Sequence, residues 1–195
     1  MGRKNLTEER TTEILDAFTR CMVKYGLDTS LDQVAEEAGM TRSIIRHYIG
    51  NREEVVNMLI ERITADFVAE LQTEAAQIPQ EEMIAATLDY LFDDEAGYDN
   101  TDKLIFDVMM TAQDRYLQAK QTLIGMFEEL ITMFADDLEL AYPQADKTHC
   151  RNVAYSVLAL AMSHESLKGL GMNKRYRAAA RTNAETLIRT LEFSG

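Results

Sequence analysis

The chain has 195 residues and a net charge of −13, and only two prolines and 9 glycines interrupt its apolar-periodic segments. A chain of this length can bury a proper core, and so few breakers favour an all-helical fold. No run of about 18 apolar residues occurs, so no membrane span is predicted. Cys21 and Cys150 are too few for a disulfide framework, and the polar N-terminus lacks a secretory signal, so a cytoplasmic location is expected.

The negative charge is unevenly distributed along the chain. Residues 1–65 hold 9 Lys/Arg and 11 Asp/Glu, a net of −2, whereas residues 66–195 hold 11 and 22, a net of −11. The first third can therefore still present a basic face to nucleic acid, while phosphate repels the acidic remainder.

Four helices are predicted from about residue 7 to Pro79, because apolar residues recur there at three- and four-residue spacing. They cover about residues 7–25, 31–38, 42–48 and 52–78. The caps agree with these boundaries, because small polar or glycine residues occupy the expected positions. The N-caps are Ser30, Thr41 and Asn51, and the glycines are Gly26 and Gly39.

Five further helices are predicted after Pro79. Their approximate ranges are 80–93, 101–113, 115–141, 144–168 and 174–193. The predicted fold is therefore all-α with about nine helices, in which an N-terminal helix-turn-helix domain (residues 1–54) precedes a C-terminal helical domain (residues 55–195).

The segment from Ser30 to Glu54 has the layout of a helix-turn-helix DNA reader. Its second helix turns Ile44, Ile45 and Tyr48 inward and exposes polar and basic side chains. A helix fits the major groove of B-DNA, where arginine can donate two hydrogen bonds to guanine. Threonine hydroxyls and the first turn of the next helix can hold phosphate. The predicted DNA contacts are Thr29, Thr41, Arg42, Ser43, Arg46, His47 and Arg52. The alternative is a surface helix with ordinary solvated arginines.

This segment resembles the DNA-binding domain of TetR-family transcriptional regulators. The resemblance covers about residues 8–60, and the matching motifs are Tyr25-Gly26, Thr29-Ser30-Leu31, Val34-Ala35, Ala38-Gly39-Met40-Thr41-Arg42-Ser43, Tyr48 and Asn51-Arg52-Glu53-Glu54-Val55.

The resemblance implies a homodimeric repressor, less often an activator, whose C-terminal domain binds a small molecule and whose last two helices form the dimer. It would bring Arg42 and Ser43 to bases, Thr41 and His47 to bases or phosphate, and Arg52 to phosphate. The family usually has aromatic residues in place of Arg46 and Ile49, and a small residue, often glycine, in place of Ser43. The operator sequence of another family member therefore does not predict the operator of this protein.

The middle helices combine methionines with aromatic residues, which suits a pocket for a small apolar or aromatic effector. The predicted ligand-binding residues are Phe92, Phe106, Met109, Met110, Tyr116, Phe127, Tyr155 and Met162. The alternative is that these side chains simply form the core.

The last two predicted helices carry apolar stripes rich in small residues, which permit close approach of a partner helix. The predicted dimer interface consists of Val153, Val157, Leu160, His164, Ala180, Ala184, Leu187 and Leu191. Packing within one chain is the alternative reading of the same stripes.

No grouping of nucleophile and base and no phosphate-cradling glycine loop occurs, so no catalytic residue, cofactor or metal site is predicted. His149 and Cys150 are adjacent and point in different directions on a helix, which argues against a metal pair. The predicted function is a ligand-responsive transcriptional regulator, expected to be a repressor. Its predicted partners are double-stranded DNA, an effector molecule and a second copy of the chain, and no membrane association is predicted. The alternative is an acidic helical small-molecule carrier or interaction module that does not bind DNA.

Overall fold

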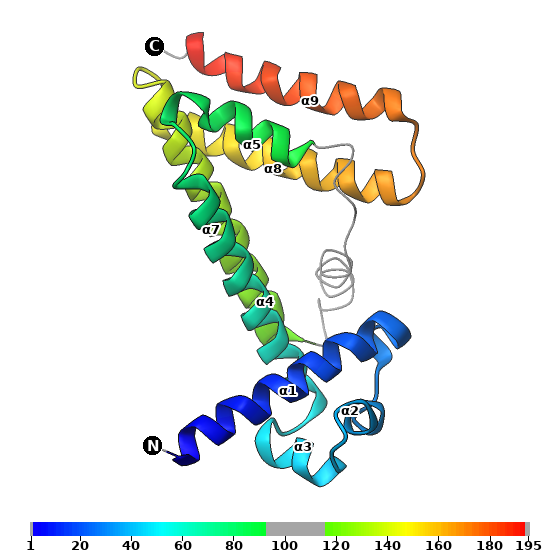
Figure 1. Cartoon of the computed structure of the whole chain (residues 1–195). Helices are drawn as coiled ribbons and strands as arrows, with labels where there is room; N and C mark the ends of the chain where they lie inside the picture. Colours follow the sequence, from blue (N-terminus) through cyan, green and yellow to red (C-terminus); the bar gives the residue numbers. More distant parts are fainter. Residues whose placement is uncertain (1, 93–115, 194–195) are drawn as a thin grey trace. The chain divides into compact units, whose positions relative to one another are not determined.

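The computed structural model describes residues 2–92 and 116–193, and all regular structure in these residues is helical (Figure 1). The α-helices are α1 (Gly2–Tyr25), α2 (Leu31–Glu37), α3 (Arg42–Tyr48), α4 (Arg52–Ala75), α5 (Met83–Leu91), α7 (Leu117–Ala141), α8 (Lys147–Gly169) and α9 (Lys174–Arg189). Three 3-10 turns accompany them, η1 (Gly26–Asp28), η2 (Gln80–Glu82) and η3 (Thr190–Phe193). The predicted all-α fold is confirmed, and the helix expected over 101–113 lies outside the described residues.

The described residues form two compact units. Unit 1 contains residues 2–67 and 116–125, and unit 2 contains residues 68–92 and 126–193. Both boundaries fall inside a helix, one in α4 and one in α7. The sequence placed the division after residue 54, whereas the packing of unit 1 extends along α4 to Phe67.

In unit 1, α1 packs against both α2 and α3 (Figure 1). The apolar stripe of α1 supplies Ile14, Phe18 and Cys21, which are buried together with Val34 of α2 and Ile45 of α3. A three-helix unit of this kind hides the apolar sides of two short helices that could not be stable alone.

Local side-chain hydrogen bonds define the starts of these helices. The hydroxyl of Ser30 accepts from the backbone N–H of Gln33 at 3.2 Å, and the side chain of Gln33 accepts from the N–H of Ser30 at 2.7 Å, which forms a capping box. Thr41 caps α3, and Asn51 accepts from the N–H groups of Glu53 and Glu54 at the start of α4. Gly39 has a φ of +63° in the turn between α2 and α3, a conformation that favours glycine.

The exposure of Ile44 departs from its predicted position. Ile44, expected to face inward with Ile45, is 38% exposed, and Ile49 after the end of α3 is buried instead. Successive residues on a helix are about 100° apart, so Ile44 and Ile45 do not share the centre of one face. Tyr25, the last residue of α1, is also exposed.

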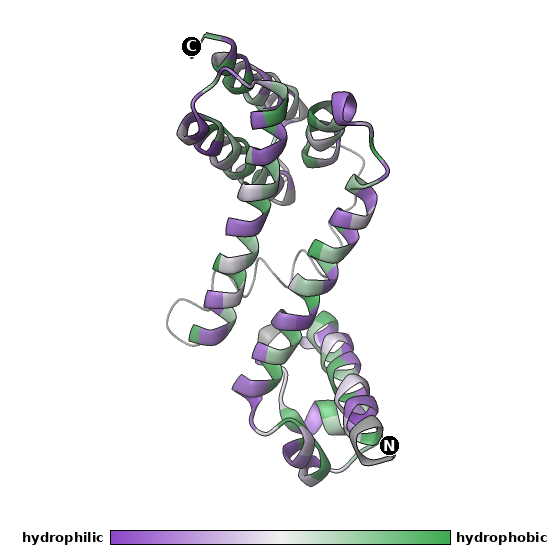
Figure 2. Ribbon diagram, turned by 90° about the vertical axis from the view of Figure 1, so that its left-hand side faces the viewer, coloured by the Kyte–Doolittle hydropathy of each residue, from purple (hydrophilic) through white to green (hydrophobic). Residues whose placement is uncertain are grey.

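In unit 2, α8 and α9 lie side by side and share a core with α5 and the later part of α7 (Figure 1). Hydrophobic and hydrophilic residues alternate along the long helices, as expected where one helix face is buried (Figure 2). Asp146 caps α8, and Asn173 caps α9. Among the helices described, none combines the length and the apolarity that crossing a bilayer requires.

Candidate nucleic-acid interface

The outward surface of α3 brings together five of the seven predicted DNA contacts. We define this reading face as Thr41, Arg42, Ser43, Arg46 and His47, all of which are exposed. Ile45 anchors the helix from behind, because its side chain is completely buried. The structure therefore presents a rigidly backed helix with two arginines on its solvent side.

The two arginines of the reading face have different surroundings. Arg42 donates from Nη1 to Oδ2 of Asp32 on α2 at 2.8 Å, and both side chains remain more than half exposed. An exposed ion pair of this kind contributes about 0–1 kcal/mol, so it orients the guanidinium without preventing exchange for a DNA partner. No local sequence pattern predicts the pairing of Asp32 with Arg42, because the two residues meet only where α2 and α3 cross in the fold.

Arg46 is the arginine of the reading face that is available for a new partner. Among the described side chains of residues 6–67, it is the arginine for which neither an ion pair nor a hydrogen bond is found. Its neighbour His47 makes an edge contact with the ring of Tyr48, with 5.1 Å between the ring centroids. Thr41 and Ser43 share a hydrogen bond of 2.9 Å between their hydroxyl oxygens.

Thr29 does not lie on the reading face, although its sequence position predicted a phosphate contact. Its side chain is completely buried, and its hydroxyl donates to the carbonyl oxygen of Gly26 at 2.8 Å. The prediction for Thr29 is corrected, because this hydroxyl satisfies a carbonyl at the end of α1 and is closed off from solvent. The spacing of three residues after a helix-ending glycine is the sequence signal for this role.

The Arg52 side chain is also turned inward, and with it Tyr116. The Nε of Arg52 donates to the carbonyl oxygen of Thr29 at 3.0 Å, its Nη1 donates to the hydroxyl of Tyr116, and its guanidinium lies 5.7 Å from the centroid of that ring. We call this arrangement the Arg52 bridge. Arg52 and Tyr116 thus bind each other in the structure, and the phosphate contact of Arg52 and the ligand contact of Tyr116 stay predictions. The two residues are 64 positions apart, so no local pattern could have paired them.

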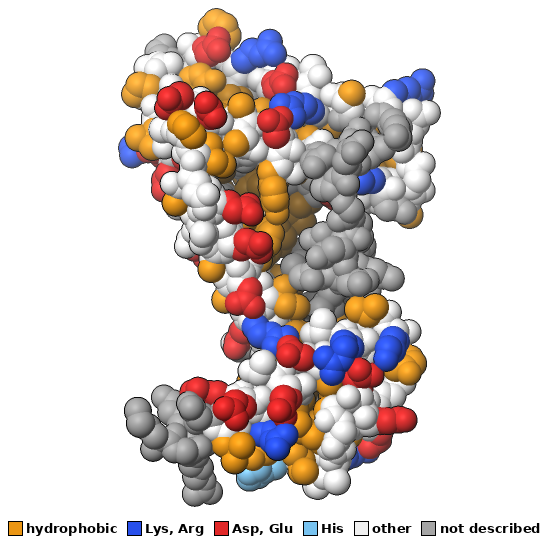
Figure 3. All heavy atoms as spheres, in the orientation of Figure 1, with side chains coloured by type: hydrophobic (Ala, Val, Ile, Leu, Met, Phe, Trp, Pro, Cys, Tyr) orange, Lys and Arg blue, Asp and Glu red, His pale blue; other side chains and the backbone are white. Residues whose placement is uncertain are grey.

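Most of the remaining basic side chains of unit 1 are neutralised by nearby acids. Arg20 and Lys24 donate to the two carboxylate oxygens of Glu37 at 2.8 and 2.9 Å. These hydrogen bonds hold the pKa of Glu37 below its ordinary value, and the bond with Glu37 raises the pKa of Lys24. Figure 3 accordingly shows acidic and basic side chains interspersed over this part of the chain on the face drawn. Arg46 of α3 is thus an exposed positive charge that no described acid neutralises.

In unit 2, six of the eight residues predicted for the dimer interface are buried by the chain's own helices. These are Val153, Val157, His164, Ala180, Ala184 and Leu191. The prediction is corrected for these six. The five apolar side chains pack α8 and α9 into the core of one chain, and His164 is buried beside Phe92. Leu160 and Leu187 are only partly buried.

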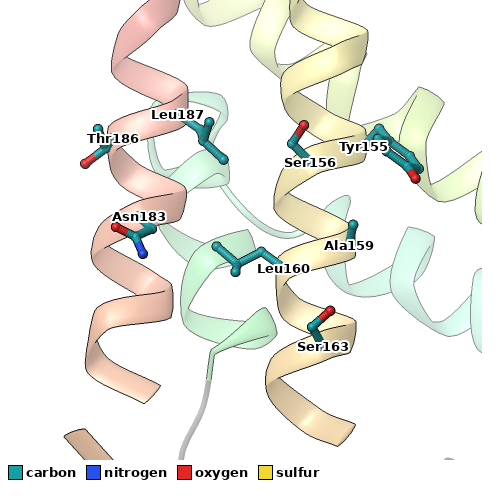
Figure 4. Close-up of a pocket in the computed structure, with 8 residues that line it drawn as sticks. All are labelled: Tyr155, Ser156, Ala159, Leu160, Ser163, Asn183, Thr186 and Leu187. Carbon is teal, nitrogen blue, oxygen red and sulfur yellow. The ribbon is translucent and has the colours of Figure 1, made fainter. Parts of the chain in front are cut away.

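Leu160 and Leu187 line a groove between α8 and α9 (Figure 4). In the close-up both leucines point into the space between the two helices, whereas Tyr155 projects from the other side of α8. The groove is lined by Tyr155, Ser156, Ala159, Leu160, Ser163, Asn183, Thr186 and Leu187. The small residues at positions 156, 159 and 163 could have predicted this groove from the sequence. The neighbouring stripe of α8 is more apolar and was predicted as the interface instead.

The predicted ligand-binding residues do not form one cluster in the described part of the chain. Phe92 is buried at the end of α5 and Phe127 is partly buried, but Tyr155 is 61% exposed and Met162 is also exposed. Tyr155 and Met162 therefore do not line an interior pocket in this chain, because the outer surface of α8 carries them. Phe106, Met109 and Met110 lie outside the described residues.

The cysteines and acidic residues form no recognisable centre in the described residues. Burial raises the pKa of the thiols of Cys21 and Cys150, which suits core side chains. Within residues 2–92 and 116–193, no group of three or more His, Cys, Asp or Glu side chains is placed to hold a metal ion.

The fold and the reading face define a helix-turn-helix transcriptional regulator, and sequence relatives agree. The chain is 31% identical to the HTH-type transcriptional regulator SrpR of Pseudomonas putida, with 68% of this chain and 77% of that protein covered. It is 32% identical to the uncharacterized HTH-type transcriptional regulator TtgW, also of Pseudomonas putida, with 60% and 98% covered. No family model matches this chain.

Solved structures add the particular fold family. A TetR transcription regulator from Haloarcula marismortui superposes with a TM-score of 0.77 at 15% identity, over 94% of this chain and 98% of that one. The chain belongs to the TetR family of transcriptional regulators.

Proposed function

We propose that the protein is a ligand-responsive repressor that binds a two-fold operator as a homodimer. The observation that carries the DNA part is the reading face, where Arg42 and Arg46 lie on the solvent side of a helix anchored by buried Ile45. A helix of this kind enters the major groove, and each arginine can read a guanine with about 1–3 kcal/mol of discrimination. Thr41, Ser43 and His47 add contacts to bases or phosphate.

The dimer part is supported by the groove between α8 and α9. Leu160 and Leu187 leave apolar surface open there, and the small side chains of Ser156, Ala159 and Ser163 allow a second helix pair to approach closely. A second copy of the chain that covers this groove would form a four-helix arrangement. Two copies also serve the function, because a two-fold operator presents half-sites about 34–36 Å apart.

The ligand response acts through a change in operator affinity. An effector that binds one conformation of the dimer better than the other shifts the population, and it changes DNA affinity by the difference in binding free energy. The Arg52 bridge offers a route, since it joins the first residue of α4 and the residue before α7 to the Thr29 carbonyl in front of α2. The effector itself is expected to be a small apolar or aromatic molecule.

The proposal is tested by measuring binding of the purified full chain to DNA fragments from around its own gene over a range of salt concentrations. We expect the affinity to fall steeply with salt, because phosphate contacts release counterions. Arg46→Ala should weaken binding at least tenfold, which corresponds to about 1.4 kcal/mol. Arg151→Ala is the matched control, because Arg151 is an exposed arginine of α8 that pairs with Glu128.

An acidic carrier or interaction module without DNA binding is the competing function, and the net charge of −13 favours it. It predicts no salt-dependent binding to any fragment and equal behaviour of Arg46→Ala, Arg42→Ala and the wild-type chain. Either result would overturn the DNA-binding proposal. Loss of binding in Arg42→Ala and Arg46→Ala, with binding retained in Arg151→Ala, would support it.

A further inference from the structure

His164 is a polar residue in an apolar place. It belongs to α8, only 5% of its surface is exposed, and its Nε2 atom is buried without a hydrogen-bond partner in the described part of the chain. Its ring makes an edge contact with Phe92, with 5.8 Å between the ring centroids and 61° between the ring planes. Both residues belong to unit 2.

An imidazole at this position has a cost that a hydrocarbon side chain would avoid. A buried polar atom loses its hydrogen bonds to water and regains nothing unless it finds a partner. The next turn of α8 toward the N-terminus carries the apolar residues Leu160 and Ala161, so a leucine at position 164 would continue the stripe. The unmet hydrogen-bonding capacity of Nε2 therefore indicates a partner that is supplied from outside the chain.

The surroundings restrict the chemistry of that partner. None of the ion pairs formed by the described residues includes His164, and an uncharged guest avoids the cost of burying a charge without a partner. A neutral imidazole has one donor and one acceptor nitrogen, and a hydroxyl group can match either one. Phe92 presents an aromatic ring beside it, which favours an aromatic guest.

We propose that His164 is the hydrogen-bonding anchor of the effector site and that the effector class is an aromatic molecule bearing a hydroxyl group. Nε2 of His164 meets the hydroxyl, and Phe92 packs against the aromatic rings. This inference rests on the proposed ligand response. It also explains why a histidine occupies a stripe that otherwise packs α8 into the core.

The experiment compares two probes of similar size, 1-naphthol and 1-methylnaphthalene, by calorimetric titration of the full chain. We expect the wild-type chain to bind 1-naphthol about five- to tenfold more tightly, which is the range of one net hydrogen bond. His164→Leu should abolish this preference while keeping the affinity for 1-methylnaphthalene. His164→Gln keeps a hydrogen-bonding side chain and should retain part of the preference, and Thr148→Ala, an exposed change on α8, should leave it unchanged.

A second readout separates this role from a structural one. If His164 only supports the fold, His164→Leu lowers the melting temperature, whereas removal of an unmatched polar atom should raise it by about 2–4 °C. The proposal is overturned if neither probe binds, if the wild-type chain shows no preference for the hydroxyl, or if His164→Leu keeps it. Tighter binding of 1-naphthoate than of 1-naphthol would equally overturn it, because the preferred guest would then be an anion.

The same variants are assayed for DNA binding so that the two proposals fail separately. If operator binding persists in His164→Leu while the probes fail to bind, the proposed role of His164 is overturned and the proposed DNA binding stands. Absence of DNA binding in the wild-type chain would instead remove the proposed function itself.

Discussion

The two units differ in the hydrogen bonds of their inward-turned polar side chains. In unit 1 the Thr29 hydroxyl donates to Gly26, and the Nε and Nη1 atoms of Arg52 donate to Thr29 and Tyr116. Unit 2 buries Nε2 of His164 against Phe92 without a hydrogen bond in the described residues. The hydrogen bonds of unit 1 hold its side chains in one geometry. In unit 2, the buried Nε2 atom keeps an unused capacity for a hydrogen bond.

This difference fits the tasks that we propose for the two units. A helix that reads bases must keep its side chains in fixed positions, because direct readout depends on the geometry of paired hydrogen bonds. A site that responds to a molecule needs a conformation that the molecule stabilises more than the alternative conformation, because a ligand shifts an equilibrium only by its differential affinity. The following changes test whether the contrast between the units is real.

The largest effect is expected from removing buried anchors. Ile45→Ala in unit 1 and Leu138→Ala in unit 2 both empty completely buried sites and should each lower the free energy of unfolding by about 2–5 kcal/mol. Only Ile45 supports the reading face, so DNA affinity at equal folded fraction should fall in Ile45→Ala and persist in Leu138→Ala. Urea unfolding and DNA titration measure the two quantities, and equal losses of affinity would contradict the contrast.

An intermediate effect is expected from the Arg52 bridge. Tyr116→Phe removes an acceptor for a charged guanidinium and should cost about 1.5 kcal/mol of unfolding free energy. Tyr142→Phe in unit 2 is the matched control, because no hydrogen bond of the Tyr142 hydroxyl is found in the described residues, and it should be nearly neutral. Equilibrium unfolding of both variants decides the point, and a neutral Tyr116→Phe would mean that the bridge does not stabilise unit 1.

The smallest effects are expected from two carboxyl groups, and they should have opposite signs. Hydrogen bonds from Arg20 and Lys24 lower the pKa of Glu37 in unit 1, so its stabilisation is present above its unfolded-state pKa and is lost as the pH falls through the folded-state value. Burial raises the pKa of Asp137 in unit 2, against the hydrogen bond from Gln80, so stability falls as the pH rises from its unfolded-state value through the folded-state value.

At neutral pH, Glu37→Gln should therefore slightly destabilise the chain, and Asp137→Asn should slightly stabilise it. Well below pH 4 both differences should shrink, because both carboxyl groups become protonated in the folded and unfolded states. Unfolding midpoints measured as a function of pH test this, and high salt should weaken the Glu37 effect in particular. Effects of the same sign at neutral pH would remove the proposed difference between the units.

The sequence predicted features that depend on neighbours along the chain. The caps at Ser30, Thr41 and Asn51 and the glycine turn at Gly39 are local, and the structure contains them. The reading face followed from the same local pattern.

Features made by distant residues could not be predicted in this way. Arg52 meets Tyr116 across 64 positions, and nothing near Arg52 shows that its side chain turns inward. The apolar stripes of α8 and α9 were visible, but a stripe does not reveal whether it packs within one chain or between two. Only the fold shows that Val157 and Ala184 are already covered.

The way α3 is held has a consequence for the evolution of operator preference. Of its seven residues, Ile45 is the buried one, and the other side chains are fully or partly exposed. Under the proposed function, exchanges at positions 42, 43, 46 and 47 alter the recognised bases with little damage to folding, because surface substitutions usually change stability by no more than about 0.5 kcal/mol. On this proposal, new operator preferences arise by exchanges on the exposed surface of α3, while the buried side of the helix and the rest of unit 1 stay unchanged.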